Sequence, residues 1–510
     1  MYDLAIIGAG VIGCALSYSL SAYDLRIALI EKENDLAMGA SRANTALIHA
    51  GFDPSPDSLM GKLNVEGNRL CYQICRDLDV EHRQTGSLVL AFEEADLPIL
   101  EKLYRQGLAN GCEGLEIISG QEALEREPNL SPAVIGALWA PEAGVINPWE
   151  FTLAMAEVAV RNGLDLMLNS KVVALSDRGD HYDLQLARID HEGRESDRSS
   201  LSARYLVNAA GIDSDHIHNR LAAPAFEIQP TRGEYYLLDR AVGPLVQSIL
   251  FESPSDRGKG VTVSPTIHDN FLIGPSSHLI EDREDTGVTR PVLDEIERTA
   301  RRLVPSLDVG ASIRNFAGIR ANSDHNDFFI QISARHFLDL AAIKSPGLTC
   351  APSIARYARD LLEEEGLVTK SVDGRKTVYA ITDAGRAEVS ARAADLEGIE
   401  ADLADSVRLI ADEVRSSVRE AMKSLRADLA ATAGQEHAQS NRQATREDDP
   451  RARSRDQLHV ADAAINEFRA RVRSDLRSHV ARGGELAASV VDDLVKALDE
   501  AGRNVTRALR

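Results

Sequence analysis

The sequence predicts a mixed α/β fold up to about residue 362, followed by a short β-hairpin and long helices. Two observations carry this prediction. The apolar run 4–7 precedes the glycine-rich run Gly8-Ala9-Gly10-Val11-Ile12-Gly13, and a stretch typical of a buried helix follows it. The composition also changes near residue 362, because all five cysteines and both tryptophans of the chain lie before it. The chain therefore consists of two parts of different composition.

The glycine-rich run has the G-x-G-x-x-G spacing of a dinucleotide-binding turn between a strand and a helix. Gly8 permits the turn, Gly10 lets the backbone approach a pyrophosphate, and Gly13 lets the helix pack closely on the strand. Unpaired N–H groups at the helix start favour negative phosphates. A second strand, 26–30, leads to Glu31, whose carboxylate can accept hydrogen bonds from ribose hydroxyls. The alternative is a βαβ unit whose glycines serve packing alone.

Composition excludes several classes of protein. The formal net charge of −22 disfavours non-specific binding of the whole chain to nucleic acid or anionic membranes. Cys71 and Cys75 are one helical turn apart, which we attribute to an apolar helix face and not to a metal site. Few cysteines, odd in number, favour a reducing, cytoplasmic location. No run approaches the roughly 20 apolar residues that a transmembrane helix needs.

The C-terminal part predicts helices that need a partner. We expect a winged-helix-like hairpin over 363–390, an amphipathic helix over 391–433, a polar flexible linker over 434–456 and a helical tail over 457–510. Apolar residues from Leu396 to Leu429 recur at spacings of three and four, which forms one stripe on a charged helix. Such a stripe favours helix pairing or a homodimer through the tail.

Further motifs show a resemblance to known proteins. The small-residue segment 39–51 and the run Asn208-Ala209-Ala210-Gly211, which follows the strand 205–207, resemble the D-amino-acid-oxidase-like FAD-dependent oxidoreductases. The motifs at 62–68, 231–235, 258–261, 272–275, 316–320 and 345–349 are similar to the branch of glycerol-3-phosphate oxidases and dehydrogenases. That branch also contains L-2-hydroxyglutarate oxidases.

This resemblance implies a discontinuous Rossmann-like FAD-binding domain, built from residues 1–80, 145–225 and 315–362. A mainly antiparallel α+β substrate domain, residues 81–144 and 226–314, is inserted into it. The pyrophosphate would lie at the glycine turn and the adenosine ribose at Glu31. The other implied FAD contacts are Ser41, Asn44, Ala210, Gly211, Gly318, Gly347, Leu348 and Thr349.

The implied reaction is oxidation of a secondary alcohol by hydride transfer to flavin N5. His49 is the candidate base, because an imidazole with the ordinary pKa of ~6.5 accepts protons at neutral pH. The alternative is a structural histidine under the flavin. Arg320 and Lys259 are the candidate groups for the anionic end of the substrate, since a guanidinium forms a planar fork for phosphate or carboxylate. Arg232 is a further candidate contact, and we expect no metal.

Several functions stay open at this point. The small anionic substrate is sn-glycerol 3-phosphate or, as the alternative, L-2-hydroxyglutarate, and the electron acceptor is oxygen or a quinone-linked carrier. Residues 362–386 resemble the wing of PadR-like winged-helix regulators, so a flavin-containing transcription regulator or an inactive chimera is another alternative. The first helices of a winged-helix domain are missing and the chain is acidic, so we do not expect DNA binding.

Overall fold

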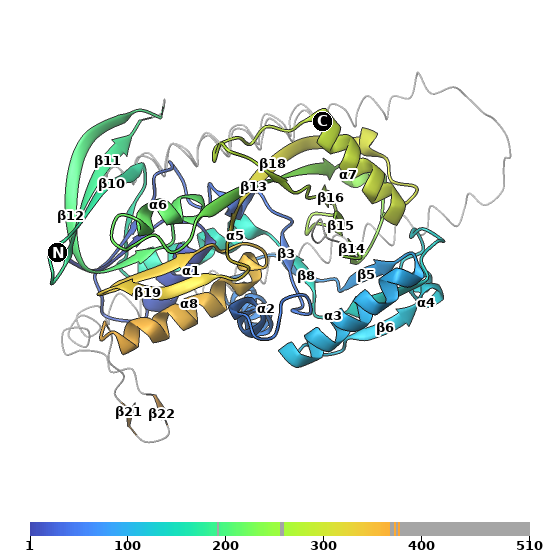
Figure 1. Cartoon of the computed structure of the whole chain (residues 1–510), viewed down its shortest axis with the longest axis horizontal. Coiled ribbons are helices and arrows are strands. Elements are labelled where there is room, and N and C mark those ends of the chain that lie inside the picture. The colour runs from blue at the N-terminus through green and yellow to red at the C-terminus, as the bar shows by residue number, and fades with distance from the viewer. Residues whose placement is uncertain (191–192, 255–259, 368–371, 374–375, 378–510) are drawn as a thin grey trace, which may run out of the picture. The chain divides into compact units, whose positions relative to one another are not determined.

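The computed structural model describes residues 1–190, 193–254, 260–367, 372–373 and 376–377 (Figure 1). The chain divides into two units, 1–379 and 380–510, and all described residues belong to the first. The predicted amphipathic helix, linker and helical tail, and with them the predicted homodimer contact, lie outside the described residues. None of the described helices is long and apolar enough to span a membrane.

The first sheet forms around β1 (Tyr2–Ile7), whose apolar run is buried. Its parallel neighbours are β2 (Ile27–Ile30) and β12 (Glu195–Asn208), and β9 (Asp165–Met167) and β20 (Phe337–Ala341) extend the parallel part. The strands β10 (Ser170–Asp177), β11 (Tyr182–Ile189) and β19 (Phe329–Ala334) add antiparallel pairs. Segments distant in sequence therefore meet in one sheet, as a doubly wound fold requires.

Helices cover this sheet because their apolar faces complete its core. The helix α1 (Val11–Leu20) packs against α5 (Pro148–Arg161) and α8 (Gly347–Glu364), and α8 also packs against α2 (Leu59–Asp77) (Figure 1). Cys71 and Cys75 lie buried on α2 in the same core as Cys14 and Cys350. The prediction that these two thiols belong to an apolar helix face is confirmed.

The second sheet is mainly antiparallel and has the order β17-β13-β16-β15-β14-β5-β7-β6, with β18 on β13. Its strands are β5 (Ser87–Ala91), β6 (Glu116–Ser119), β7 (Gly136–Ala140), β13 (Ile228–Leu238), β14 (Ile249–Glu252), β15 (Thr262–Pro265), β16 (Phe271–Gly274), β17 (His278–Leu279) and β18 (Ser312–Ser323). The helices α3 (Leu97–Asn110), α4 (Gly120–Arg126) and α7 (Arg290–Leu303) pack on these strands.

A small third sheet consists of β3 (Leu47–Ile48), β8 (Gly144–Ile146) and β4 (His82–Gln84) in this order, and His49 directly follows β3. The short helix α6 (Ser214–His218) follows β12. The predicted mixed α/β fold is thus confirmed for the first unit.

The helix α8 ends at a glycine. Gly366 has a φ of +88°, and the amide of Leu367 bonds the carbonyl of Leu362. At its other end, the amide of Cys350 bonds the carbonyl of Pro346, and the helix begins at Gly347. The strands β21 (Val372–Asp373) and β22 (Lys376–Thr377) pair antiparallel where the hairpin turn was predicted.

Candidate active site

The glycine turn between β1 and α1 has the close approaches that its sequence predicts. Gly8 has a φ of +103°, and a Cβ there would overlap the carbonyl oxygen of Ala209 at the end of β12. A Cβ on Gly13 would overlap the carbonyl oxygen of Gly8. Only glycine fits either position, so α1 starts directly against the carboxyl ends of two parallel strands. This is where open α/β sheets bind their ligands.

Glu31 is fixed at the end of β2. Its carboxylate accepts hydrogen bonds from the amide of Ala9 at 2.7 Å and from the amide of Glu33 at 3.0 Å. Burial raises the pKa of Glu31, and the two backbone hydrogen bonds act against this rise. The carboxylate therefore ties the glycine turn to β2 and still borders the cleft.

The loop that contains Ser41 and Asn44 uses these side chains in different ways. Ser41 Oγ accepts a hydrogen bond from the amide of Val11 at the start of α1, at 2.9 Å. The side-chain amide of Asn44 donates to the carbonyls of Ala40 and Ser41, and its oxygen accepts from the amide of Ala46. Asn44 therefore shapes the loop through local contacts, and Ser41 joins the loop to the helix start.

A cleft of about 3030 Å³ runs past both sheets. Most pockets for small ligands measure roughly 300–1,000 Å³, so this cleft has room for a dinucleotide and a substrate together. Most of the predicted site residues line it; these are Gly8, Gly10, Glu31, Ser41, Asn44, His49, Ala210, Gly211, Gly318, Arg320, Gly347 and Leu348. Gly13 and Thr349 do not line the cleft. Gly13 packs against the Gly8 carbonyl, and Thr349 Oγ1 accepts a hydrogen bond from the amide of His49.

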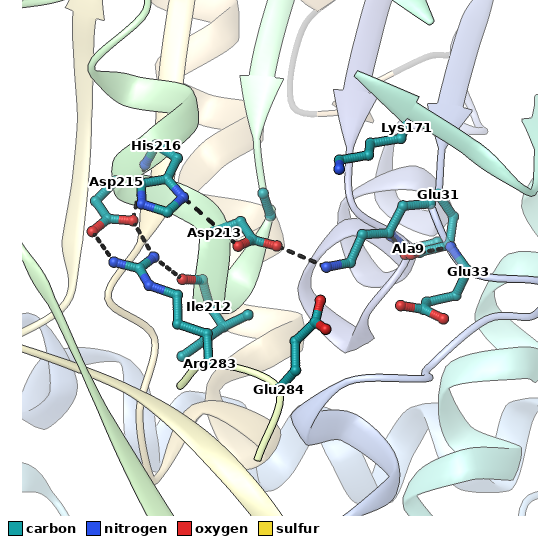
Figure 2. Close-up of polar contacts among 12 residues, drawn as sticks. Ala9, Glu31, Glu33, Lys171, Ile212, Asp213, Asp215, His216, Arg283 and Glu284 are labelled. Carbon is teal, nitrogen blue, oxygen red and sulfur yellow. Dashed lines mark hydrogen bonds and ion pairs between the residues drawn. The ribbon is translucent and has the colours of Figure 1, made fainter. Parts of the chain in front are cut away.

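Ion pairs that the sequence did not indicate involve the lining residues Lys32, Asp213 and Arg283 (Figure 2). Lys32, next to Glu31, lies 2.9 Å from the carboxylate of Asp213. Arg283, from the loop between β17 and α7, forms two hydrogen bonds with Asp215, at 2.6 and 2.7 Å, and a third with the carbonyl of Ile212. These contacts join the loop after β12 to both sheets. We call the Arg283–Asp215 pair the clasp.

His49 is held by its backbone on both sides. Its amide donates to Thr349 Oγ1 at 3.0 Å, and the Thr349 hydroxyl donates to the carbonyl of Leu47. Its carbonyl accepts from the side-chain amide of Asn68 at 3.0 Å. The imidazole Nε2 lies 3.3 Å from Ser345 Oγ, and both residues line the cleft. The ring is thereby presented to the cleft next to the segment that starts α8.

Arg320 also borders the cleft, on β18. A guanidinium has five N–H donors, and one of them donates to the carbonyl of Ser276. Its Nε is buried and has no hydrogen-bond partner among the described residues. The guanidinium therefore brings a positive charge to the border of the cleft, which suits an anion.

The other two predicted cations are Arg232 and Lys259. Arg232 forms ion pairs with Asp285 and with the fully buried Glu234, and it is not among the residues that line the cleft. Its charge is paired within the protein, and a direct contact of Arg232 with the substrate stays a prediction. Lys259 lies outside the described residues. Within the described part of the chain, no group of His, Cys, Asp and Glu side chains could hold a metal ion.

The model of the DAO family, described as FAD dependent oxidoreductase, matches residues 3–361. The chain belongs to this family of FAD-dependent oxidoreductases. A glycerol 3-phosphate dehydrogenase of Caloramator mitchellensis is 44% identical over 365 residues, which cover 71% of this chain and 74% of the relative. A glycerol 3-phosphate oxidase of Mycoplasma pneumoniae is 33% identical over 367 residues, covering 71% and 94%.

A more distant relative and a solved structure complete the comparison. A mitochondrial L-2-hydroxyglutarate dehydrogenase of Arabidopsis thaliana is 26% identical over 398 residues, covering 70% of this chain and 82% of the relative. The dithionite-reduced L-alpha-glycerophosphate oxidase of Mycoplasma pneumoniae with FAD bound is similar at a TM-score of 0.65 and 31% identity, covering 71% and 94%.

The residues of this oxidoreductase fit FAD. The glycine turn leaves space that a Cβ at Gly8 would remove, and the start of α1 faces the cleft through Gly10, Val11 and Ile12. The fixed carboxylate of Glu31 borders the same space. Sequence reasoning named most of this lining. It missed Ser276, although this residue directly follows the quoted Gly274-Pro275 motif, and it gave no role to Ser345.

Proposed function

We propose that this protein oxidises sn-glycerol 3-phosphate at its secondary hydroxyl, with hydride transfer to flavin N5. The proposal is carried by one observation, which is that a histidine and an arginine, His49 and Arg320, border one FAD-type cleft. The identities of 44% and 33% to a glycerol 3-phosphate dehydrogenase and oxidase support the same substrate.

Each part of the chain has a defined task in this proposal. Residues 1–80, 145–225 and 315–362 bind FAD, and residues 81–144 and 226–314 complete the substrate side. Bound FAD supplies the hydride acceptor. His49 takes the hydroxyl proton through Nε2, and Arg320 together with Lys259 binds the phosphate. Ser276 holds the Arg320 guanidinium in place through its carbonyl.

L-2-hydroxyglutarate is the second candidate substrate, because a mitochondrial dehydrogenase for it is a relative at 26% identity. Its carboxylates would bind the same cations. For the electron acceptor, the oxidase from Mycoplasma pneumoniae favours oxygen, and the dehydrogenase from Caloramator mitchellensis leaves a quinone-linked carrier as the alternative.

The test is an anaerobic visible spectrum of the purified FAD-loaded protein before and after addition of each candidate substrate. We expect glycerol 3-phosphate to bleach the flavin bands, and glycerol, which lacks the anion, to leave them unchanged. Bleaching by L-2-hydroxyglutarate alone would transfer the proposal to that substrate. Protein without flavin bands would favour an inactive chimera. Admission of air then measures whether oxygen restores the bands.

Two variants separate the roles of the cations and the base. His49→Asn should lower the rate constant of flavin reduction by about 10²–10⁴-fold, the usual contribution of general base catalysis. Arg320→Gln should weaken substrate binding by roughly 10–100-fold, since charge-assisted hydrogen bonds contribute about 1.5–3 kcal/mol each. The control is Arg105→Gln on α3, because Arg105 is exposed and is not among the residues that line the cleft.

A further inference from the structure

Three parallel strands of the first sheet end at the same level. Ile7 of β1 pairs with Ile30 of β2 on one side and with Asn208 of β12 on the other. Adjacent strands lie about 4.8 Å apart, so roughly 10 Å separates the ends of β2 and β12. The glycine turn begins with Gly8, directly after Ile7, and the amide of Gly8 bonds the carbonyl of Ile30. The segments that follow β2 and β12 therefore flank this turn.

An ion pair connects the two flanking segments. Lys32 is the second residue after β2, and its Nζ lies 2.9 Å from a carboxylate oxygen of Asp213, in the loop after β12. The other oxygen of Asp213 lies 3.9 Å from Nδ1 of His216 (Figure 2). Although burial acts to lower the pKa of Lys32, the neighbouring Asp213 raises it above its ordinary value. Lys32 therefore keeps its positive charge, and we call the Lys32–Asp213 pair the crossbar.

The crossbar borders the FAD cleft. Both of its residues line the cleft together with Gly8, Gly10 and Glu31. In this type of fold the pyrophosphate lies at the helix N-terminus, and the carboxylate after the second strand binds the ribose. Lys32 directly follows that carboxylate, Glu31. The crossbar therefore lies beside the place of the adenosine half of FAD and connects the segments on either side of the glycine turn.

We propose that the crossbar retains FAD, because the adenosine half of the cofactor leaves the cleft only after the Lys32–Asp213 pair has opened. The two side chains are 37% and 33% exposed, so salt screens their attraction. Partly exposed ion pairs of this kind change an equilibrium by about two- to fivefold. The inference concerns release of the cofactor and does not depend on which alcohol the protein oxidises.

A direct attraction between Lys32 and the phosphates of FAD predicts a different result. Removal of the positive charge would then weaken FAD binding, and removal of the negative charge of Asp213 would strengthen it, because FAD is an anion. The crossbar needs both charges, so removal of either one should speed FAD release. The two explanations therefore predict opposite effects for a variant of Asp213.

The test measures the rate constant of FAD release from flavin fluorescence after the FAD-loaded protein is diluted into low-salt buffer. Lys32→Met and Asp213→Asn should each raise this rate constant about threefold, within the range for partly exposed ion pairs, and the double variant should raise it no further. At about 1 M salt, where the Debye length is about 3 Å, the variants and the wild type should release FAD equally fast. The matched control is Arg105→Gln, which also removes one positive charge from an ion pair but does not line the cleft, and it should behave as wild type.

Slower release from Asp213→Asn would assign Lys32 to the FAD phosphates and overturn the inference. Unchanged release in both single variants, or additive effects in the double variant, would overturn it as well. An ion pair that only supports the fold would lower the Tm and leave release unchanged well below the Tm, whereas we expect the Tm of both variants to stay within about one degree of the control.

If a variant is purified without FAD, a crystal structure of the FAD-bound wild-type protein decides the question. A distance of at most about 4 Å between Lys32 Nζ and the Asp213 carboxylate, the usual limit for an ion pair, supports the inference. Separated side chains with FAD in place overturn it. Wild-type protein that binds FAD but that no alcohol reduces would refute the proposed function, and the release measurements would stand apart from that failure.

Discussion

The clasp between Arg283 and Asp215 should be a major stabilising contact of the first unit. The Asp215 side chain is 5% exposed and the Arg283 side chain 20% exposed. Replacing Arg283 by glutamine removes both hydrogen bonds to the carboxylate and the third to the carbonyl of Ile212. The carboxylate then keeps the amides of Ile228 and His216 as donors, but no opposite charge.

The expected cost follows from this burial. Removal of one partner of a buried ion pair costs about 3–5 kcal/mol, and the partial exposure of Arg283 favours the lower end, about 3 kcal/mol. With an unfolding entropy of about 2.1 cal/mol/K per residue, the 379 residues of the first unit give roughly 0.8 kcal/mol/K. Arg283→Gln should therefore lower the Tm by about 4 °C.

Thermal unfolding of the FAD-loaded protein, followed by flavin fluorescence, measures this change. The matched control is Arg105→Gln, which breaks the exposed ion pair with Glu101 and should cost at most about 0.5 kcal/mol. The double variant Arg283→Gln/Asp215→Asn should recover part of the loss, because the unpaired buried charge is gone. A Tm of Arg283→Gln within one degree of the control would refute the reasoning (the one-degree limit is about a quarter of the expected shift).

Three further outcomes follow from the geometry. Although burial acts to raise it, hydrogen bonds from Arg283 and from the Ile228 amide hold the pKa of Asp215 below its ordinary value. The clasp is therefore fully effective above ~pH 4, the ordinary aspartate pKa, and the Tm difference between wild type and Arg283→Gln should shrink as the pH falls further. Gly13→Ala, whose methyl would overlap the Gly8 carbonyl, should yield protein without bound flavin by absorbance, whereas Gly136→Ala, with the flexible tip of Leu97 as nearest atom, should retain it. Because burial raises the pKa of Cys75 and Cys112 to about 12 and all five cysteines are buried, a thiol reagent at neutral pH should label none in the native protein and all after denaturation; rapid native labelling would contradict the packing described here.

The sequence was informative wherever the determinants were local. The turn at Gly8, the close approach at Gly13 and the carboxylate of Glu31 follow from neighbouring strands and a helix that adjoin in sequence. Their spacing alone defines the dinucleotide-binding edge. The same holds for the end of α8, where Gly366 adopts the positive φ that a glycine after a helix commonly takes.

The choice between two arginines could not be made from the sequence. Arg232 and Arg320 both lie beside glycines in quoted motifs, and only the register of β13 and β18 separates them. Arg320 pairs with Thr231, and Arg232 pairs with Ile319. Since successive side chains of a strand point to opposite faces, the two arginines lie on opposite faces of the sheet. A register shifted by one residue would have placed both arginines on the same face.

The clasp is a second feature that the sequence could not predict. Arg283 comes from a loop of the second sheet and Asp215 from a helix that follows the first sheet, so no local pattern relates them. Neither residue belongs to a motif with a known chemistry. Such a contact depends on how the two sheets meet. A single sequence contains no periodic signal for the packing of one sheet against another.

The sequence gives no reason to distinguish Asn64 from Asn68. They occupy the same face of α2 and are almost equally buried. The difference between them lies in their partners: the side-chain amide of Asn68 donates to the carbonyls of His49 and Glu142, whereas Asn64 Oδ1 receives no hydrogen bond from the described residues. A buried polar group without a partner costs free energy in the folded state, so its retention needs a reason outside packing.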